Sequence, residues 1–342
     1  MKRSLLITCA LVIAITYSSL GFGQSRRSMK QKSSTNFTIQ QIAPGVWAAI
    51  SNDQFGKAIC NAGIVDLGDK TLVFDPFMNP KAARELRDAA EQLTNKPVSI
   101  VINSHYHNDH IRGNQVFSED AMIISTTFTR NEIQRIEPGE QQWELRHAAG
   151  LLKATRKRMS LATTIEKEEL PIWIGYYEGM VESADELKMT LPNIVFNDSL
   201  WIIGSERSVK LEECRDGHTA SDIVLLIPQE GIAFMGDLLF VERHPWISDG
   251  KPESWQSSLK KFYEDPLYKT FLPGHGPMAQ KPALQQLYQY LGTVQDLCKA
   301  ADNDSLQMVL MQQPIPQPYQ HWYFGRFYQP NLQHLLITKK EE

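Results

Sequence analysis

Three histidines and one aspartate crowd into six positions of the stretch NSHYHNDH, at His105, His107, Asp109 and His110. The whole chain contains only nine histidines, so this one turn holds a third of them. Imidazole and carboxylate groups are ligands that suit zinc, and also iron or manganese. Because His105 and His107 are two positions apart, both rings can point to the same side of an extended turn. The stretch therefore predicts a metal-binding loop.

Three later stretches repeat this local plan, in which an apolar run is followed by a glycine turn and then a histidine or aspartate. RDGHTASD contains His218, FMGDLLF contains Asp237 and LPGHGP contains His275. Strand ends that meet at one edge of a sheet can bring such residues to one site. Burying so many titratable groups together without cations would be costly, so the pattern predicts two divalent ions. The predicted metal ligands are His105, His107, Asp109, His110, His218, Asp237 and His275.

The chain must fold so that these turns converge, and its apolar pattern indicates how. Short β-rich runs and amphipathic helices alternate, which predicts an α/β sandwich with its helices outside. The predicted strands cover 45–51, 61–68, 70–76, 98–103, 121–125, 199–204, 208–214, 222–228, 231–236 and 269–274. The predicted helices cover 79–95, 253–263 and 281–300, and residues 127–191 form a charged, helical insertion.

The two ends of the chain differ in composition from the region between them. Lys2 and Arg3 precede an apolar run shorter than the ~20 residues that a bilayer requires, which predicts a cleaved signal peptide and not a stable membrane anchor. We therefore expect a periplasmic or secreted protein. The predicted segments are a signal peptide (1–23), a flexible linker (24–36), the main domain (37–300) and a C-terminal extension (301–342).

The composition limits the kinds of partner. Charged residues make up 22% of the chain and the formal net charge is −4, which gives no basic surface for nucleic acid. We expect a small-molecule substrate, and the sequence leaves the oligomeric state open.

The motifs H-x-H-x-D-H, G-H-T, G-D and G-H-G occur here in an order that resembles the metallo-β-lactamase superfamily, over about Val46 to Tyr290. The resemblance implies the four-layer αβ/βα sandwich of that family. It also implies that Asp75 lies close to the metals. It assigns His105, His107 and His218 to one metal, and Asp109, His110 and His275 to a second, with Asp237 bridging the two.

Such a site would make its own nucleophile. Two zinc ions can share a hydroxide that attacks a carbonyl or phosphoryl centre at neutral pH, and Asp109 would be the catalytic residue that orients it and shuttles its proton. Asp237 stands where dedicated β-lactamases usually have Cys or Ser, which resembles glyoxalase II and lactonases. We therefore expect an exported dinuclear zinc hydrolase that cleaves an ester, thioester, lactone or amide-type bond.

Several alternatives remain beside this hydrolase. A β-lactamase proper is compatible with export, and a mononuclear iron persulfide dioxygenase keeps much of the same motif. Iron or manganese could replace zinc. A non-catalytic binding protein is disfavoured because every ligand is present. The flavin-linked diiron members have Glu where this chain has His107.

Aromatic residues of the insertion are the candidates for substrate contacts, although the insertion could equally be a packing layer or a dimer face. Two further candidates follow Asp237 toward the same edge. The predicted substrate-binding residues are Trp143, Trp173, Tyr176, Tyr177, His244 and Trp246.

Overall fold

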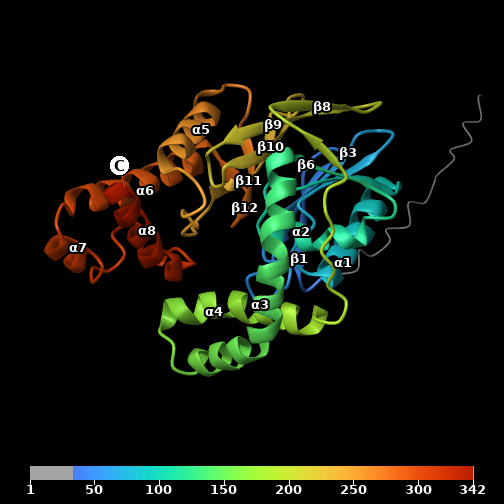
Figure 1. Cartoon of the computed structure of the whole chain (residues 1–342). Coiled ribbons are helices and arrows are strands. Elements are labelled where there is room, and N and C mark those ends of the chain that lie inside the picture. The colour runs from blue at the N-terminus through green and yellow to red at the C-terminus, as the bar shows by residue number, and fades with distance from the viewer. Residues whose placement is uncertain (1–33, 342) are drawn as a thin grey trace, which may run out of the picture. The chain divides into compact units, whose positions relative to one another are not determined.

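The structure, a computed structural model, describes residues 34–341 (Figure 1). The predicted signal peptide and most of the predicted linker lie outside the described residues. No helix within 34–341 is both long and apolar enough to cross a membrane.

The first sheet runs in the order β1 to β7 and changes character in the middle. Strands β1 to β4 pair antiparallel, whereas β4 to β7 pair in parallel. Its strands are β1 (Phe37–Ala43), β2 (Val46–Ser51), β3 (Ala62–Asp66), β4 (Thr71–Phe74), β5 (Val98–Ile102), β6 (Met122–Thr126) and β7 (Ile194–Phe196). A parallel pair needs a crossover, and α1 (Pro80–Thr94) makes the one between β4 and β5. Asn79 begins α1 by accepting hydrogen bonds from the backbone N–H groups of Lys81 and Ala82.

The second sheet has the order β13-β12-β11-β10-β9-β8, with a single parallel pair between β11 and β12. Its strands are β8 (Ser199–Ile203), β9 (Ser208–Arg215), β10 (Ser221–Ile227), β11 (Ile232–Phe240), β12 (Thr270–His275) and β13 (Ala279–Gln280). Helices α5 (Pro252–Glu264) and α6 (Lys281–Ala300) follow β11 and β13.

Alternating side chains assign each face of the two sheets to a different core. In β2, Val46 and Ala48 join the cluster between the sheets, whereas Trp47 packs in the cluster that includes α1. In β10, Leu225 faces the inner cluster and Leu226 faces the cluster with α5 and α6. Both sheets are therefore covered on two sides, which confirms the predicted four-layer αβ/βα sandwich.

The predicted helical insertion consists of two long helices that pack against each other, α3 (Thr127–Met159) and α4 (Thr164–Ser183) (Figure 1). Thr126 caps α3 by accepting a hydrogen bond from the backbone N–H of Thr129. Helical structure ends at Ser183, earlier than the predicted limit of the insertion, and residues 184–193 lead back to β7.

The C-terminal extension packs into the same core as α5 and α6. It contains α7 (Asp304–Leu310), two short 3-10 turns (Tyr319–His321 and Gly325–Phe327) and α8 (Tyr328–Glu341). Helix α8 contacts α6, beside which it lies in Figure 1. The extension contributes seven buried side chains to this core: Ala301, Leu310, Tyr319, Trp322, Tyr328, Leu332 and Leu336.

Candidate metal centre

All seven predicted ligands lie at one edge of the sandwich. His105 and His107 directly follow β5, and the short helix α2 (Asn108–Ile111) carries Asp109 and His110. His218 lies in the turn from β9 to β10, Asp237 lies on β11, and His275 ends β12. The predicted ligands thus lie at the ends of three strands and within a fourth.

The first group of donor atoms belongs to His105, His107, His218 and Asp237, and these atoms all lie within 4.8 Å of one another. His218 Nε2 is 3.0 Å from His107 Nδ1, and His105 Nε2 is 3.8 Å from Asp237 Oδ2. His105 Nε2 is buried and has no hydrogen-bond partner. A buried donor atom without a partner beside converging imidazoles fits a cation.

The second group joins His110, His275 and Asp237, whose donor atoms also lie within 4.8 Å of one another. Asp109 Oδ2 lies 3.3 Å from His275 Nε2 and 3.5 Å from His110 Nε2. Asp237 is shared by both groups, because its Oδ1 is 3.2 Å from His110 Nε2 and its Oδ2 is 3.4 Å from His218 Nε2. This position fits a carboxylate that bridges two ions.

The shifted pKa values in the second group indicate that positive charge is stabilised there. Burial alone would raise the pKa of Asp109, but the facing imidazoles of His110 and His275 lower that pKa to about 2. Burial opposes the charged form of His275, yet Asp237 and Asp109 raise its pKa to about 9. Both shifts favour positive charge beside these carboxylates, which is the charge that a divalent cation would supply.

The first group behaves differently, because two of its imidazoles are neutral and ready to coordinate. Burial lowers the pKa of His218 to about 3, and burial likewise lowers the pKa of His105 well below its usual range. Neutral imidazole is the form that binds zinc.

Two carboxylates outside the predicted ligand set contact predicted ligand histidines. Asp75 Oδ2 lies 2.9 Å from His110 Nδ1, and Asp75 Oδ1 accepts a 2.7 Å hydrogen bond from the backbone N–H of Ser104. Asp75 therefore lies beside the ligands, as the family resemblance implied. Asp249 makes the equivalent contact with the other group, with Oδ2 3.0 Å from His107 Nε2. Such partners fix the ring orientation of a ligand histidine.

Asp249 was not predicted from the sequence, because its only signal was proximity to Trp246. The structure joins the two, since Trp246 Nε1 donates a 2.9 Å hydrogen bond to Asp249 Oδ2.

Glycine allows β11 and β12 to approach at Asp237. A Cβ on Gly274 would lie 1.9 Å from Asp237 Oδ1, so no other residue fits there. Gly236 has φ +52°. We expected the strand to end at Gly236, but β11 continues to Phe240. Its pairing with β12 is irregular between Gly236 and Phe240, which leaves Asp237 outside the regular ladder.

Cys60 lies beside the second group, a position that its sequence context does not foretell. Its Sγ donates a 3.0 Å hydrogen bond to the backbone oxygen of Asp109, and burial raises the pKa of the thiol to about 12. The cysteines of the described residues, Cys60, Cys214 and Cys298, are all free and buried.

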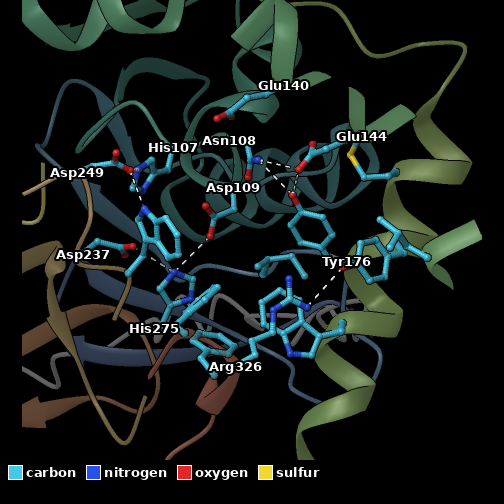
Figure 2. Close-up of a pocket in the computed structure, with 18 of the residues that line it drawn as sticks. His107, Asn108, Asp109, Glu140, Glu144, Tyr176, Asp237, Asp249, His275 and Arg326 are labelled. Atoms are coloured by element: carbon cyan, nitrogen blue, oxygen red, sulfur yellow. Dashed lines mark hydrogen bonds and ion pairs between the residues drawn. The ribbon is translucent and has the colours of Figure 1, made fainter. Parts of the chain in front are cut away.

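A cavity of about 660 Å³ opens over both groups (Figure 2). The metal-site residues form one side of it, and aromatic residues of α3, α4 and the C-terminal extension form the other. Five of the predicted substrate residues line it: Trp143, Trp173, Tyr176, Tyr177 and Trp246. The cavity wall also contains residues that sequence reasoning missed: Asn108, Glu140, Glu144, Phe324, Arg326 and Phe327.

The prediction that His244 lines the cleft is wrong. His244 is fully buried, its Nδ1 lies 3.0 Å from the hydroxyl oxygen of Tyr290, and its ring packs near Trp322 and Tyr328. The chain turns away from the cavity at this position because the backbone around His244 bridges to Tyr323 of the C-terminal extension.

Glu144 connects the helical insertion to the predicted metal-binding loop, residues 103–110. Its carboxylate accepts hydrogen bonds from Asn108 Nδ2, at 3.2 Å, and from the Tyr176 hydroxyl, and it lies 2.5 Å from Arg112 Nη1. Arg112 is buried and also pairs with Glu137 at 2.6 Å. Helices α3 and α4 are thereby held against the loop that carries the ligands.

The family model described as the metallo-beta-lactamase superfamily matches residues 56–275. The chain belongs to this superfamily.

Three solved structures have a similar fold. A metallo-beta-lactamase from Pontibacter korlensis has 15% identity and a TM-score of 0.53, covering 75% of this chain and 99% of that chain. One from Erythrobacter litoralis, with beta-mercaptoethanol in its active site, has 14% identity and a TM-score of 0.54, covering 77% and 99%. The mono-zinc form of FIM-1 from Pseudomonas aeruginosa has 16% identity and a TM-score of 0.50, covering 77% and 98%.

Proposed function

We propose that this chain is an exported dinuclear zinc hydrolase that cleaves an ester, thioester, lactone or amide-type bond of a small molecule. The observation that carries the proposal is the position of Asp237. Its two carboxylate oxygens face donor atoms of both groups, at 3.2 Å from His110 Nε2 and 3.4 Å from His218 Nε2. Membership of the superfamily supports metal-dependent chemistry at this site.

His105, His107 and His218 would hold one ion, and Asp109, His110 and His275 the other. A pair of bound divalent ions would supply positive charge that lowers the pKa of a water between them and polarises a substrate carbonyl oxygen. Asp109, which lines the cavity, would hold that water by accepting its hydrogen bond and would receive its proton. The apolar cavity wall would exclude other water from the reacting bond.

The metal content of the purified chain tests this proposal. We expect about two zinc ions per chain, and fewer in Asp237→Asn, because this carboxylate faces both groups. Asp216→Asn is a matched control, since among residues 34–341 the only ion pair of the Asp216 carboxylate is with Lys251, at 3.2 Å, and Asp216 is no member of either group. A single iron per chain would contradict the dinuclear hydrolase and favour a persulfide dioxygenase.

The bond that is cleaved requires a second measurement. A panel of one ester, one thioester, one lactone and one β-lactam separates the proposed hydrolase from a dedicated β-lactamase. We expect hydrolysis of at least one of the first three, because Asp237 stands in place of Cys or Ser. Hydrolysis of the β-lactam alone would favour the β-lactamase alternative.

We also propose that residues 1–23 are a cleaved signal peptide and that the mature chain acts in the periplasm or outside the cell. The basic start and the short apolar run of the sequence support this proposal. The mass of the chain recovered from the periplasmic fraction tests it, with a mature N-terminus at Gln24 as the expected result. An intact chain confined to the cytosol would contradict it.

A further inference from the structure

The cavity has a strongly uneven distribution of charge. Of the described residues that line it, Arg326 is the only lysine or arginine. Four carboxylates in the wall are already engaged: Glu144 contacts Arg112, Asp249 contacts His107, and both Asp109 and Asp237 face the predicted ligand histidines. A lone guanidinium therefore shares a mostly apolar and acidic cavity with the metal centre.

No carboxylate forms an ion pair with this guanidinium in the described part of the chain. The contacts of the Arg326 guanidinium are aromatic: its Cζ lies 3.6 Å from the centroid of the Trp173 ring, and its Nη1 is 3.5 Å from the hydroxyl oxygen of Tyr177. The residue is exposed and lines the cavity. A guanidinium has five N–H donors in a planar fork, and most of them remain available for an anion here.

The segment that carries Arg326 is held firmly. Tyr323 accepts a 2.9 Å backbone hydrogen bond from His244 N and donates one of 3.0 Å to Glu242 O. The Arg243 guanidinium lies 4.4 Å from the centroid of the Tyr323 ring, and Phe324 is buried. A binding group on a well-anchored segment loses little conformational entropy when a ligand arrives.

Neighbouring rings connect Arg326 to the metal centre. The Phe324 ring centroid lies 5.4 Å from that of the ligand His275 and 5.4 Å from that of Trp173, on which Arg326 sits. Figure 2 draws Arg326 across the cavity from Glu140, on the side of His275. A substrate whose reacting bond lies at the metal centre would therefore reach the guanidinium through an apolar passage.

We propose that Arg326 is a specificity-determining residue that binds a carboxylate on the substrate, at the end of an apolar or aromatic group that lies against Trp173 and Phe324. The inference rests on the proposed hydrolase and narrows its substrate to an apolar ester, thioester, lactone or amide that carries a separate carboxylate. A carboxylate matches the planar guanidinium fork and adds only one negative charge beside Glu140 and Asp249. Arg326 lies outside residues 56–275, so the match to the family does not assign it.

Binding of unreactive probes to the full, zinc-loaded chain tests the site directly. We expect 4-phenylbutyrate to bind about tenfold more tightly than its neutral amide, as a charge-assisted pair predicts. Arg326→Met keeps the aliphatic stem over Trp173 and should abolish this preference while leaving binding of the amide unchanged. Arg326→Lys keeps the positive charge and should retain part of the preference for the carboxylate over the amide. Arg156→Met is the matched control, because Arg156 is another arginine at the surface that pairs with Glu178 and does not line the cavity.

Two results would overturn the inference. One is an equal affinity of the parent chain for carboxylate and amide, and the other is tighter binding of phenyl phosphate than of the carboxylate through Arg326.

A kinetic experiment compares the hydrolysis of 4-nitrophenyl butyrate with that of the mono-4-nitrophenyl ester of glutaric acid. Arg326→Met should raise KM about tenfold for the second ester alone, with kcat unchanged. If neither ester is hydrolysed, the proposed hydrolase is in question, but the probe binding still decides whether Arg326 recognises a carboxylate.

Discussion

At the scale of single residues, two carboxylates outside the predicted ligand set, Asp75 and Asp249, contact predicted ligand histidines. Asp75 lies in the left-handed region, with φ +57°, at the end of β4. This conformation brings one of its oxygens to Ser104 N and the other to His110 Nδ1. Asp249 serves His107 in the same way from a loop that is far away in the sequence. Each group of ligands therefore has its own outer carboxylate.

Asp75→Asn should weaken zinc binding by about 10- to 100-fold, because the amide no longer holds the Nδ1–H of His110 with a charged acceptor. Competition with a chromophoric chelator measures this affinity. The amide oxygen can still accept the hydrogen bond from Ser104 N, so the fold should be retained, and circular dichroism checks this. An unchanged zinc affinity would show that Asp75 does not position His110.

At the scale of secondary-structure elements, the inserted helices are attached to the metal loop by buried charge. Arg112, directly after α2, pairs with Glu137 and Glu144 of α3, and both of its partners are largely shielded from solvent. Glu144 also accepts from Tyr176 of α4, so one carboxylate joins three helices. Surface pairs such as Arg156–Glu178 join α3 to α4 as well, but solvent weakens them.

Glu144→Gln should lower the free energy of unfolding by about 2 kcal/mol, because Arg112 loses one buried anionic partner and keeps the other, Glu137. Glu178→Gln is the matched control on the same pair of helices and should cost less than about 1 kcal/mol. Urea unfolding of both variants measures the difference. Equal losses in the two variants would mean that Glu144 holds the insertion no more firmly than a surface pair does.

At the scale of the whole molecule, the C-terminal extension is part of the fold and not an appendage. Residues 34–341 belong to one compact unit, and the extension supplies side chains both to the core and to the cavity. His244 lies at this junction, between Tyr290 of α6 and Trp322 of the extension. Its ionisation should therefore affect the stability of the unit as a whole.

Burial lowers the pKa of His244 to about 4, whereas an unfolded chain has a histidine pKa of about 6.5. Between these values the unfolded chain binds the proton more strongly, so stability is retained above pH 6.5 and lost as the pH falls toward 4. We expect His244 to account for a loss of about 2 kcal/mol between pH 7.5 and pH 5.

Urea unfolding of chelator-treated protein at these two pH values measures the effect, and chelation removes the separate contribution of metal release. His244→Asn can still accept from the Tyr290 hydroxyl but does not titrate, so its stability should fall less over the same interval, by about that amount. Parallel losses in the parent and variant proteins would show that His244 is not the titrating group.

The amino-acid sequence alone determined the fold class and identified all seven side chains that the structure gathers at one edge. These are local signals: alternating apolar residues define a strand, and short spacings such as that of His105 and His107 place two rings on one side. Whether the seven groups hold two ions stays a prediction.

Only the tertiary structure decided which other residues complete the site. His244 and Trp246 are two positions apart and looked equivalent in the sequence, yet one is buried against Tyr290 and the other lines the cavity. Arg326 and Trp173 are distant in the chain and meet only because the C-terminal extension folds back over the inserted helices. Spacing along a chain constrains neighbours within one turn or strand, whereas contacts between distant segments depend on how the layers pack, and no local pattern records that packing.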